Sequence, residues 1–177
     1  TWSNCKTGTD RVYEVSRRID SDIYLNLQGD EPLIEPKNID KIIKELKRNI
    51  TKGFSVCTGF YKTKERQNIK KSNNYIVKSK KNKLLYISRS EIPSNYSKKE
   101  VRFIHIGIFG FTKKALNKFG NLKKGTLEIN ENNEILRLIE NDENILCTSL
   151  STNSISVDYP SDIKIIEKFL NKNDKKK

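Results

Sequence analysis

The sequence predicts an α/β fold in which helices cover a mostly parallel sheet. Segments with strand periodicity alternate along the chain with segments of helical periodicity, the pattern of strand–helix–strand units. The segment 101–111 is apolar on both faces, as expected of a strand at the centre of a covered sheet. The length of 177 residues suits one domain built around one core.

The first half of the chain alternates helix and strand. A helix is expected over 8–18, and a strand over 22–28, where apolar and polar residues alternate. Pro36 begins a second helix, because proline is favoured in the first turn, and its isoleucines repeat at helical spacing. The segment 54–61 indicates a second strand.

The second half begins with a hairpin and ends with a helix. Thr112 is expected to cap the helix that follows the central strand, and Gly120 to end it. Pro160 begins the last helix. The other elements expected here are hairpin arms at 75–77 and 83–88, a polar helix over 126–141 and a strand over 144–150.

The composition favours some classes of function over others. A net charge of +13 could indicate a nucleic-acid surface, but abundant lysine beside many asparagines and isoleucines also fits a general bias toward A·T-rich codons. Cys5, Cys57 and Cys147 are odd in number and form neither a metal-binding spacing nor a disulfide framework, so a reducing cytoplasm fits best. No apolar stretch is long enough to span a membrane.

The chain divides into one domain over 1–171 and a basic tail over 172–177. It begins at Thr1 and contains no methionine, whereas a complete reading frame would begin with one. We therefore expect the domain to be incomplete at its N-terminal end.

The segment 25–34 is the most informative part of the sequence. A predicted strand ends at Gly29 and delivers Asp30 into a turn held by Pro32. A carboxylate at a strand end is well placed to bind Mg²⁺, which uses one or two carboxylates together with substrate phosphates. A capping role for Asp30 in the strand–helix turn is the alternative, and local chemistry does not separate the two.

Six stretches in chain order resemble motifs of the CMP-Kdo synthetases, the 3-deoxy-manno-octulosonate cytidylyltransferases. They are 6–11, 25–34, 85–93, 105–111, the acidic segment 127–140 and 156–162. The resemblance implies a nucleotide-diphospho-sugar transferase type of fold, a three-layer sandwich with a mostly parallel mixed sheet, here lacking its N-terminal strands. It also implies attack of the anomeric hydroxyl of a 2-keto-3-deoxy sugar acid on the α-phosphorus of CTP, giving a CMP-sugar for lipopolysaccharide or surface polysaccharide synthesis.

The resemblance assigns roles to matching residues. Asp30 and Asp158 are the expected catalytic and metal-binding residues, with Mg²⁺ as the cofactor. Residues expected to contact the sugar acid are Gln28, Arg89, His105, Phe109 and Glu134, and those expected near the nucleotide are Thr7, Gly8 and Arg11. Each has a structural alternative: a surface ion pair for Arg89, a core position for His105, helix solubility for Glu134 and a helix cap for Asp158.

Some departures from the family pattern leave the sugar acid open. Phe109 and Ile135 stand where the family usually has Tyr and Gln. The family's N-terminal loop, whose Arg and Lys grip the triphosphate, has no counterpart, so this chain alone is expected to be poorly active. The rival interpretations are a catalytically inactive remnant and a basic module that binds nucleic acid. The expected partners are CTP and the sugar acid, with no membrane, and we expect a homodimer of the complete protein.

Overall fold

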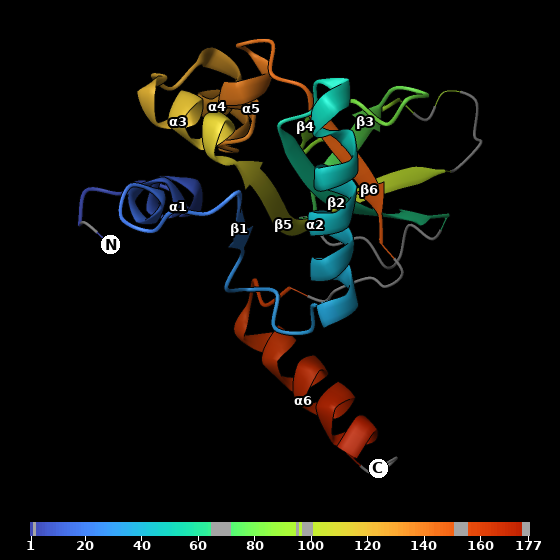
Figure 1. Cartoon of the computed structure of the whole chain (residues 1–177). Coiled ribbons are helices and arrows are strands. Elements are labelled where there is room, and N and C mark those ends of the chain that lie inside the picture. The colour runs from blue at the N-terminus through green and yellow to red at the C-terminus, as the bar shows by residue number, and fades with distance from the viewer. Residues whose placement is uncertain (2, 65–71, 95, 97–100, 151–155, 175–177) are drawn as a thin grey trace.

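The computed structural model describes residues 1, 3–64, 72–94, 96, 101–150 and 156–174. One sheet lies between helices, with α2 across one face and α3 to α5 at the opposite side (Figure 1). In chain order the elements are α1 (Gly8–Ser16), β1 (Ile23–Leu27), α2 (Pro36–Asn49), the 3-10 helix η1 (Ile50–Lys52), β2 (Val56–Thr63), β3 (Tyr75–Lys78), β4 (Leu84–Ser88), β5 (Arg102–Thr112), α3 (Lys113–Asn121), α4 (Thr126–Glu131), α5 (Leu136–Ile139), β6 (Ile145–Ser149) and α6 (Pro160–Asp174).

The α/β class is confirmed, but the predicted strand direction is wrong for most pairs in the described residues. Five of the six described strands follow the order β4-β3-β5-β2-β6, and the sixth, β1, pairs with β5. Strands β1 and β2 flank β5 and both run antiparallel to it, so only β2 and β6 form a parallel pair among the described strands. The crossover from β1 through α2 to β2 does join two strands of the same direction. Strand β5 lies between β1 and β2 and runs antiparallel to both, so β1 and β2 do not pair with each other.

Each face of the sheet has its own core. On one face, Ile42 and Leu46 of α2 pack with Cys57 and Ile106, and all four are at most 1% exposed. On the other face, the larger cluster joins strands to α3 and α5. Burial raises the pKa of Cys57 and of Cys147 to about 12, so both thiols stay protonated and behave as small core residues, as predicted.

Helix α3 begins as predicted but does not end at Gly120. Thr112 caps it by accepting a hydrogen bond from the Ala115 amide, and the helix continues to Asn121. A β-carbon at Gly120 would overlap the ring of Tyr13 in α1. Glycine at this position therefore allows two helices to approach closely, rather than ending one of them.

The single helix predicted over 126–141 is two short helices. Helix α4 ends at Glu131, the next residue Asn132 has a left-handed backbone with φ of 48°, and α5 begins at Leu136. Asparagine is one of the few residues that adopt this conformation readily, so it can end a helix where the flanking pattern is still helical. Helix α6 begins at Pro160 as predicted and runs to Asp174, three residues into the predicted tail.

Candidate active site

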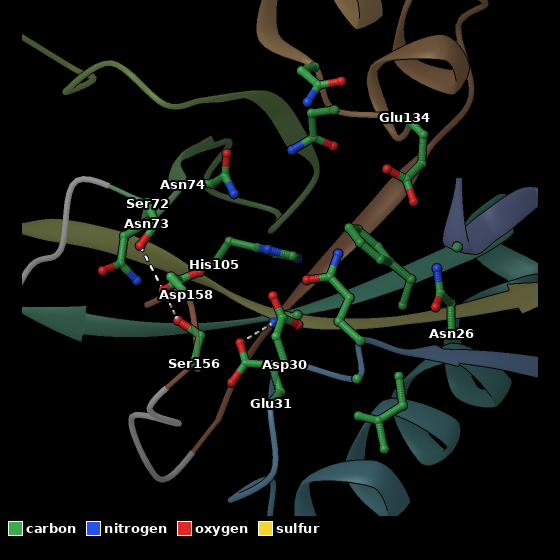
Figure 2. A pocket seen from close by; sticks show the side chains of 18 of the residues that line it. Asn26, Asp30, Glu31, Ser72, Asn73, Asn74, His105, Glu134, Ser156 and Asp158 are labelled. Atoms are coloured by element: carbon green, nitrogen blue, oxygen red, sulfur yellow. Dashed lines mark hydrogen bonds between the residues drawn. The ribbon is translucent and has the colours of Figure 1, made fainter. Parts of the chain in front are cut away.

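A cleft of about 570 Å³ lies where β1 ends beside the middle of β5. All of the predicted site residues except Thr7 line it, although they come from segments far apart in the sequence (Figure 2). Its lining residues are Gly8, Arg11, Val12, Asn26, Leu27, Gln28, Gly29, Asp30, Glu31, Ser72, Asn73, Asn74, Arg89, His105, Gly107, Phe109, Asn132, Asn133, Glu134, Ser156 and Asp158.

The loops that carry Asp30 and Asp158 are joined directly. The Val157 amide donates a hydrogen bond of 2.8 Å to the backbone carbonyl of Asp30, and both aspartates line the same cleft. Figure 2 shows both aspartates in this cleft, and Asp158 lies by Ser72 and Ser156. This contact joins two loops that lie more than a hundred positions apart in the sequence, so the fold brings both aspartates to one cleft.

Two serine hydroxyls bind the side chain of Asp158, and the Asp162 carboxylate binds its backbone amide. Its Oδ2 accepts hydrogen bonds from Ser72 Oγ at 2.8 Å and Ser156 Oγ at 2.6 Å. Asp162, in the first turn of α6, accepts from the amides of Asp158 and Tyr159, which precede the helix. The Asp162 carboxylate therefore holds the backbone at Asp158, while the Asp158 carboxylate meets the two hydroxyls at the cleft.

The part of the chain that the structure describes contains no group of three or more His, Cys, Asp or Glu side chains arranged to hold a metal ion. Asp30 and Asp158 offer hard carboxylate oxygens. That donor set fits Mg²⁺, which completes an octahedron with water and substrate phosphate oxygens.

Alternate residues of β5 form the floor of the cleft. His105 is 8% exposed, and burial lowers its pKa to about 3, so its ring is neutral near pH 7. Thr58 donates its hydroxyl proton to the Ile108 carbonyl at 2.8 Å, so the 2.9 Å contact with His105 requires Nε2 of the ring to be the donor. The other ring nitrogen, Nδ1, then carries no proton and is a hydrogen-bond acceptor.

Gly107 allows the strand-end loop to approach this floor. A β-carbon there would overlap the Gln28 side chain. The Gly107 amide donates to Glu31 Oε1 at 3.0 Å, and its carbonyl accepts from the Gln28 amide at 3.0 Å. The loop that carries Asp30 is therefore held against β5 by contacts on both sides of the aspartate.

A chain of hydrogen bonds fixes the opposite wall. Asn26 Nδ2 donates to Thr9 Oγ1 at 3.0 Å, and Thr9 Oγ1 donates to Glu134 Oε1 at 3.1 Å. Thr9 is fully buried, so the network connects α1 to the turn between α4 and α5 through the interior. Thr7 does not line the cleft; its hydroxyl caps α1 by accepting from the Asp10 amide.

Sequence reasoning missed much of the polar lining. Asn26, Asn73, Asn74, Asn132 and Asn133 all reach the cleft and none was predicted. Single amide residues in turns carry little signal of their own, and the Asn132–Asn133 pair was hidden inside a predicted helix. Ile135, which stands where the family usually has Gln, does not line the cleft: it is 1% exposed and belongs to the larger core cluster.

Comparisons with known proteins show the family and the fold of the chain. A sequence model of the family described as "Cytidylyltransferase" matches residues 1–145. The chain is 35% identical over 176 residues to the 3-deoxy-manno-octulosonate cytidylyltransferase of Elusimicrobium minutum (strain Pei191), covering 96% of this chain and 71% of that protein. It is 40% identical over 177 residues to the enzyme of the same name from Rickettsia prowazekii (strain Madrid E), covering 97% of this chain and 69% of that protein. Among solved structures, CMP:2-keto-3-deoxy-manno-octonic acid synthetase complexed with CTP superimposes with a TM-score of 0.87 at 27% identity, over 96% of this chain and 70% of that one.

Proposed function

We propose that this chain, which belongs to the cytidylyltransferase family, transfers the cytidylyl group of CTP to 3-deoxy-manno-octulosonate (Kdo). The anomeric hydroxyl of the sugar acid attacks the α-phosphorus, pyrophosphate leaves, and CMP-Kdo remains. The observation that carries the proposal is the cleft where the loops of Asp30 and Asp158 are joined beside Arg89 and His105. Such a transfer depends mainly on positioning and on neutralising phosphate charge, and this cleft provides groups for both.

Asp30 and Asp158 are the residues that would hold Mg²⁺. When bound, the ion neutralises negative charge on the triphosphate oxygens. The chain's own contribution is to keep the two carboxylates together through the Val157–Asp30 backbone contact, and to orient Asp158 through Ser72 and Ser156.

The sugar acid lies against β5 and the turn before α5 in this proposal. Arg89 offers a planar guanidinium to the carboxylate of the sugar acid. His105 accepts a hydrogen bond from a sugar hydroxyl at Nδ1, because Nε2 is occupied by Thr58. Gln28 and Glu134 supply further polar contacts, while Phe109 provides an apolar surface for the ring.

The nucleotide lies toward the start of α1. Gly8 and Arg11 line the cleft there, and Arg11 brings a positive charge near the expected position of the phosphates. Thr7 acts on the nucleotide only indirectly, because its hydroxyl holds the first turn of the helix on which Gly8 and Arg11 lie.

The product supplies the sugar acid in activated form for lipopolysaccharide or surface polysaccharide synthesis. We place the reaction in the cytoplasm, a reducing compartment in which the free thiols of Cys5, Cys57 and Cys147 persist. Among the described residues, no helix combines the length and apolar character needed to cross a bilayer.

We also infer a homodimer. Helix α6 projects away from the sheet (Figure 1), and its Ile163, Ile165, Phe169 and Leu170 are each 47–48% exposed. An exposed apolar helix face of this width is commonly covered by another surface in solution. In a symmetric dimer, each copy would cover the exposed α6 face of the other.

The direct test is product formation by the protein expressed from its complete reading frame. Incubation with CTP, Kdo and Mg²⁺ should release pyrophosphate and yield CMP-Kdo, identified by mass spectrometry. Reactions lacking Kdo, or containing ATP in place of CTP, are the controls. Pyrophosphate release that does not depend on Kdo would contradict the proposal.

Replacing either aspartate should abolish most of the activity. Asp30→Asn and Asp158→Asn each remove a carboxylate charge from the proposed ion site, and we expect kcat to fall about a hundredfold or more. Each variant should also lose the Mg²⁺-dependent rise in unfolding temperature measured in the presence of CTP. Asp22→Asn is the matched control, because Asp22 is exposed and lies outside the cleft. Unchanged activity in either cleft variant would exclude the ion site.

A further inference from the structure

We propose that Glu131 is the positioning residue of Arg89, holding this arginine so that its two terminal amino groups are available to the carboxylate of the sugar acid. The inference rests on the proposed function and adds a residue that does not itself line the cleft. It is carried by the contacts that join the end of α4 to the end of β4.

The Glu131 carboxylate binds the backbone amide of Arg89 rather than its guanidinium group. Its Oε2 accepts a hydrogen bond of 3.0 Å from the Arg89 amide, and its Oε1 accepts one of 2.6 Å from Ser88 Oγ. The Ser88 hydroxyl in turn accepts from the Ser90 amide at 2.9 Å. Three consecutive residues at the end of β4 are thereby held by the Glu131 side chain, Ser90 through the Ser88 hydroxyl.

The backbone of Glu131 makes the second attachment. Arg89 Nε donates to the Glu131 carbonyl at 3.1 Å. Carbonyls in the last turn of a helix lack an intrahelical partner and carry partial negative charge, so they accept readily from a cationic donor. Helix α4 ends at Glu131 because Asn132 adopts the left-handed conformation, and this leaves the carbonyl available.

The terminal amino groups of Arg89 keep their hydrogen-bonding capacity. Among the described residues, Arg89 makes no hydrogen bond or ion pair other than its hydrogen bonds with Glu131, and those leave both terminal amino groups unused. Arg89 nevertheless lines the cleft. An arginine with its backbone and Nε already held loses less conformational entropy when it binds a carboxylate in the two-pronged geometry.

The test replaces the carboxylate by an amide of the same shape. The Glu131 carboxylate accepts from the Arg89 amide through Oε2 and from the Ser88 and Tyr86 hydroxyls through Oε1. In Glu131→Gln a single oxygen remains, so the amide N–H groups face the donors on one of these two sides. We expect KM for the sugar acid to rise roughly tenfold, with kcat and KM for CTP changing less than about twofold, since binding of one substrate is weakened. Glu140→Gln is the matched control, because Glu140 accepts from the Leu127 amide at the other end of α4 and does not touch Arg89.

A double-mutant cycle separates positioning from general stability. If Glu131 acts through Arg89, then Glu131→Gln should add no further rise in KM in an Arg89→Ala background. Ser88→Ala removes one donor to the same carboxylate and should give a smaller rise, which provides a second test if Glu131→Gln fails to fold. An equal effect of Glu131→Gln with and without Arg89, or an equal effect of Glu140→Gln, would overturn the inference. If the wild-type protein showed no Kdo-dependent activity, that result would instead contradict the proposed function.

Discussion

At the scale of single residues, the state of His105 is set by its surroundings in the fold. Burial lowers the pKa of its ring, and Thr58 determines which nitrogen carries the proton. Position in the sequence alone left core and ligand roles open for this residue. In the structure its ring lies on a buried strand with its centroid 4.8 Å from that of Phe109, and it also lines the cleft.

Acid should destabilise the protein through His105. Its pKa is about 3 when folded against 6.5 for the free group, so between these values the unfolded chain binds a proton that the folded chain does not. Stability therefore falls as pH drops below 6.5, and we expect a loss of about 1 kcal/mol between pH 7 and pH 5.5. Urea unfolding at a series of pH values measures it.

The assignment to this residue is simple because the chain contains one histidine. In His105→Asn the dependence of stability on pH over this interval should largely disappear. An equal slope in the variant and the wild-type protein would show that another group titrates there.

Residue positions in the cleft were predictable where a motif named them and not elsewhere. Asp30, Arg89 and Asp158 were expected from ordered matches to a family, and they do line one cleft. Asn73 and Asn133 were not expected, because an asparagine in a turn is equally compatible with capping, solvation and ligand binding. Glu131 was noted only as part of an acidic segment, and its contacts with Arg89 depend on tertiary structure.

At the scale of elements, close helix contacts depend on single small residues. Helices α1 and α3 approach one another where the Tyr13 ring lies over Gly120. A glycine near the end of a helical pattern predicts that the helix ends there, and for Gly120 this prediction was wrong. Glycine is favoured both where a helix ends in a left-handed conformation and where two helices approach closely, and the sequence does not distinguish the two cases. The prediction of one continuous helix over 126–141 was wrong because the leucines and isoleucines around Asn132 keep helical spacing across the turn.

The variant Gly120→Ala should be less stable than the wild-type protein, although alanine is the better helix former. The added methyl group overlaps Tyr13, and overpacking of this kind costs about 1–3 kcal/mol, more than the gain of up to about 1 kcal/mol in helix propensity. Chemical denaturation measures the difference.

The exposed neighbour Asn121 provides the control, since Asn121→Ala changes propensity without a new contact. In a Tyr13→Ala background the same Gly120→Ala change should become neutral or stabilising. Destabilisation that persists without the ring would show that the Tyr13 contact is not the cause.

At the scale of the whole molecule, strand direction was the feature least accessible from sequence. Alternating strands and helices indicated parallel pairing, and the β1–α2–β2 crossover follows that rule. The insertion of β5 between β1 and β2 is a long-range event without a local signature. The apolar character of β5 on both faces did predict its central place, because burial leaves a trace in composition where strand order does not.

The exposed face of α6 carries the prediction at this scale. If two copies associate through it, the double variant Ile163→Glu with Phe169→Glu should lower the dimer fraction, because like charges would be buried at the interface. Sedimentation velocity at several protein concentrations gives the state of association.

Lys168→Glu is the matched control on the same helix, since it alters charge at an exposed position without removing apolar area. It should leave the dimer intact. A wild-type protein that is monomeric throughout, or a double variant that still dimerises, would exclude this face as the interface.

The dual position of Phe109 bears on how such an enzyme can change during evolution. Its side chain is 2% exposed, belongs to the larger core cluster, and still lines the cleft. A mutation that alters substrate preference at this position also alters the interior on which folding depends. New specificities are therefore more accessible through the asparagines in the turns that line the cleft, such as Asn73 and Asn133, than through its floor. Lineages that did change the floor would first have needed surplus stability gained elsewhere in the chain.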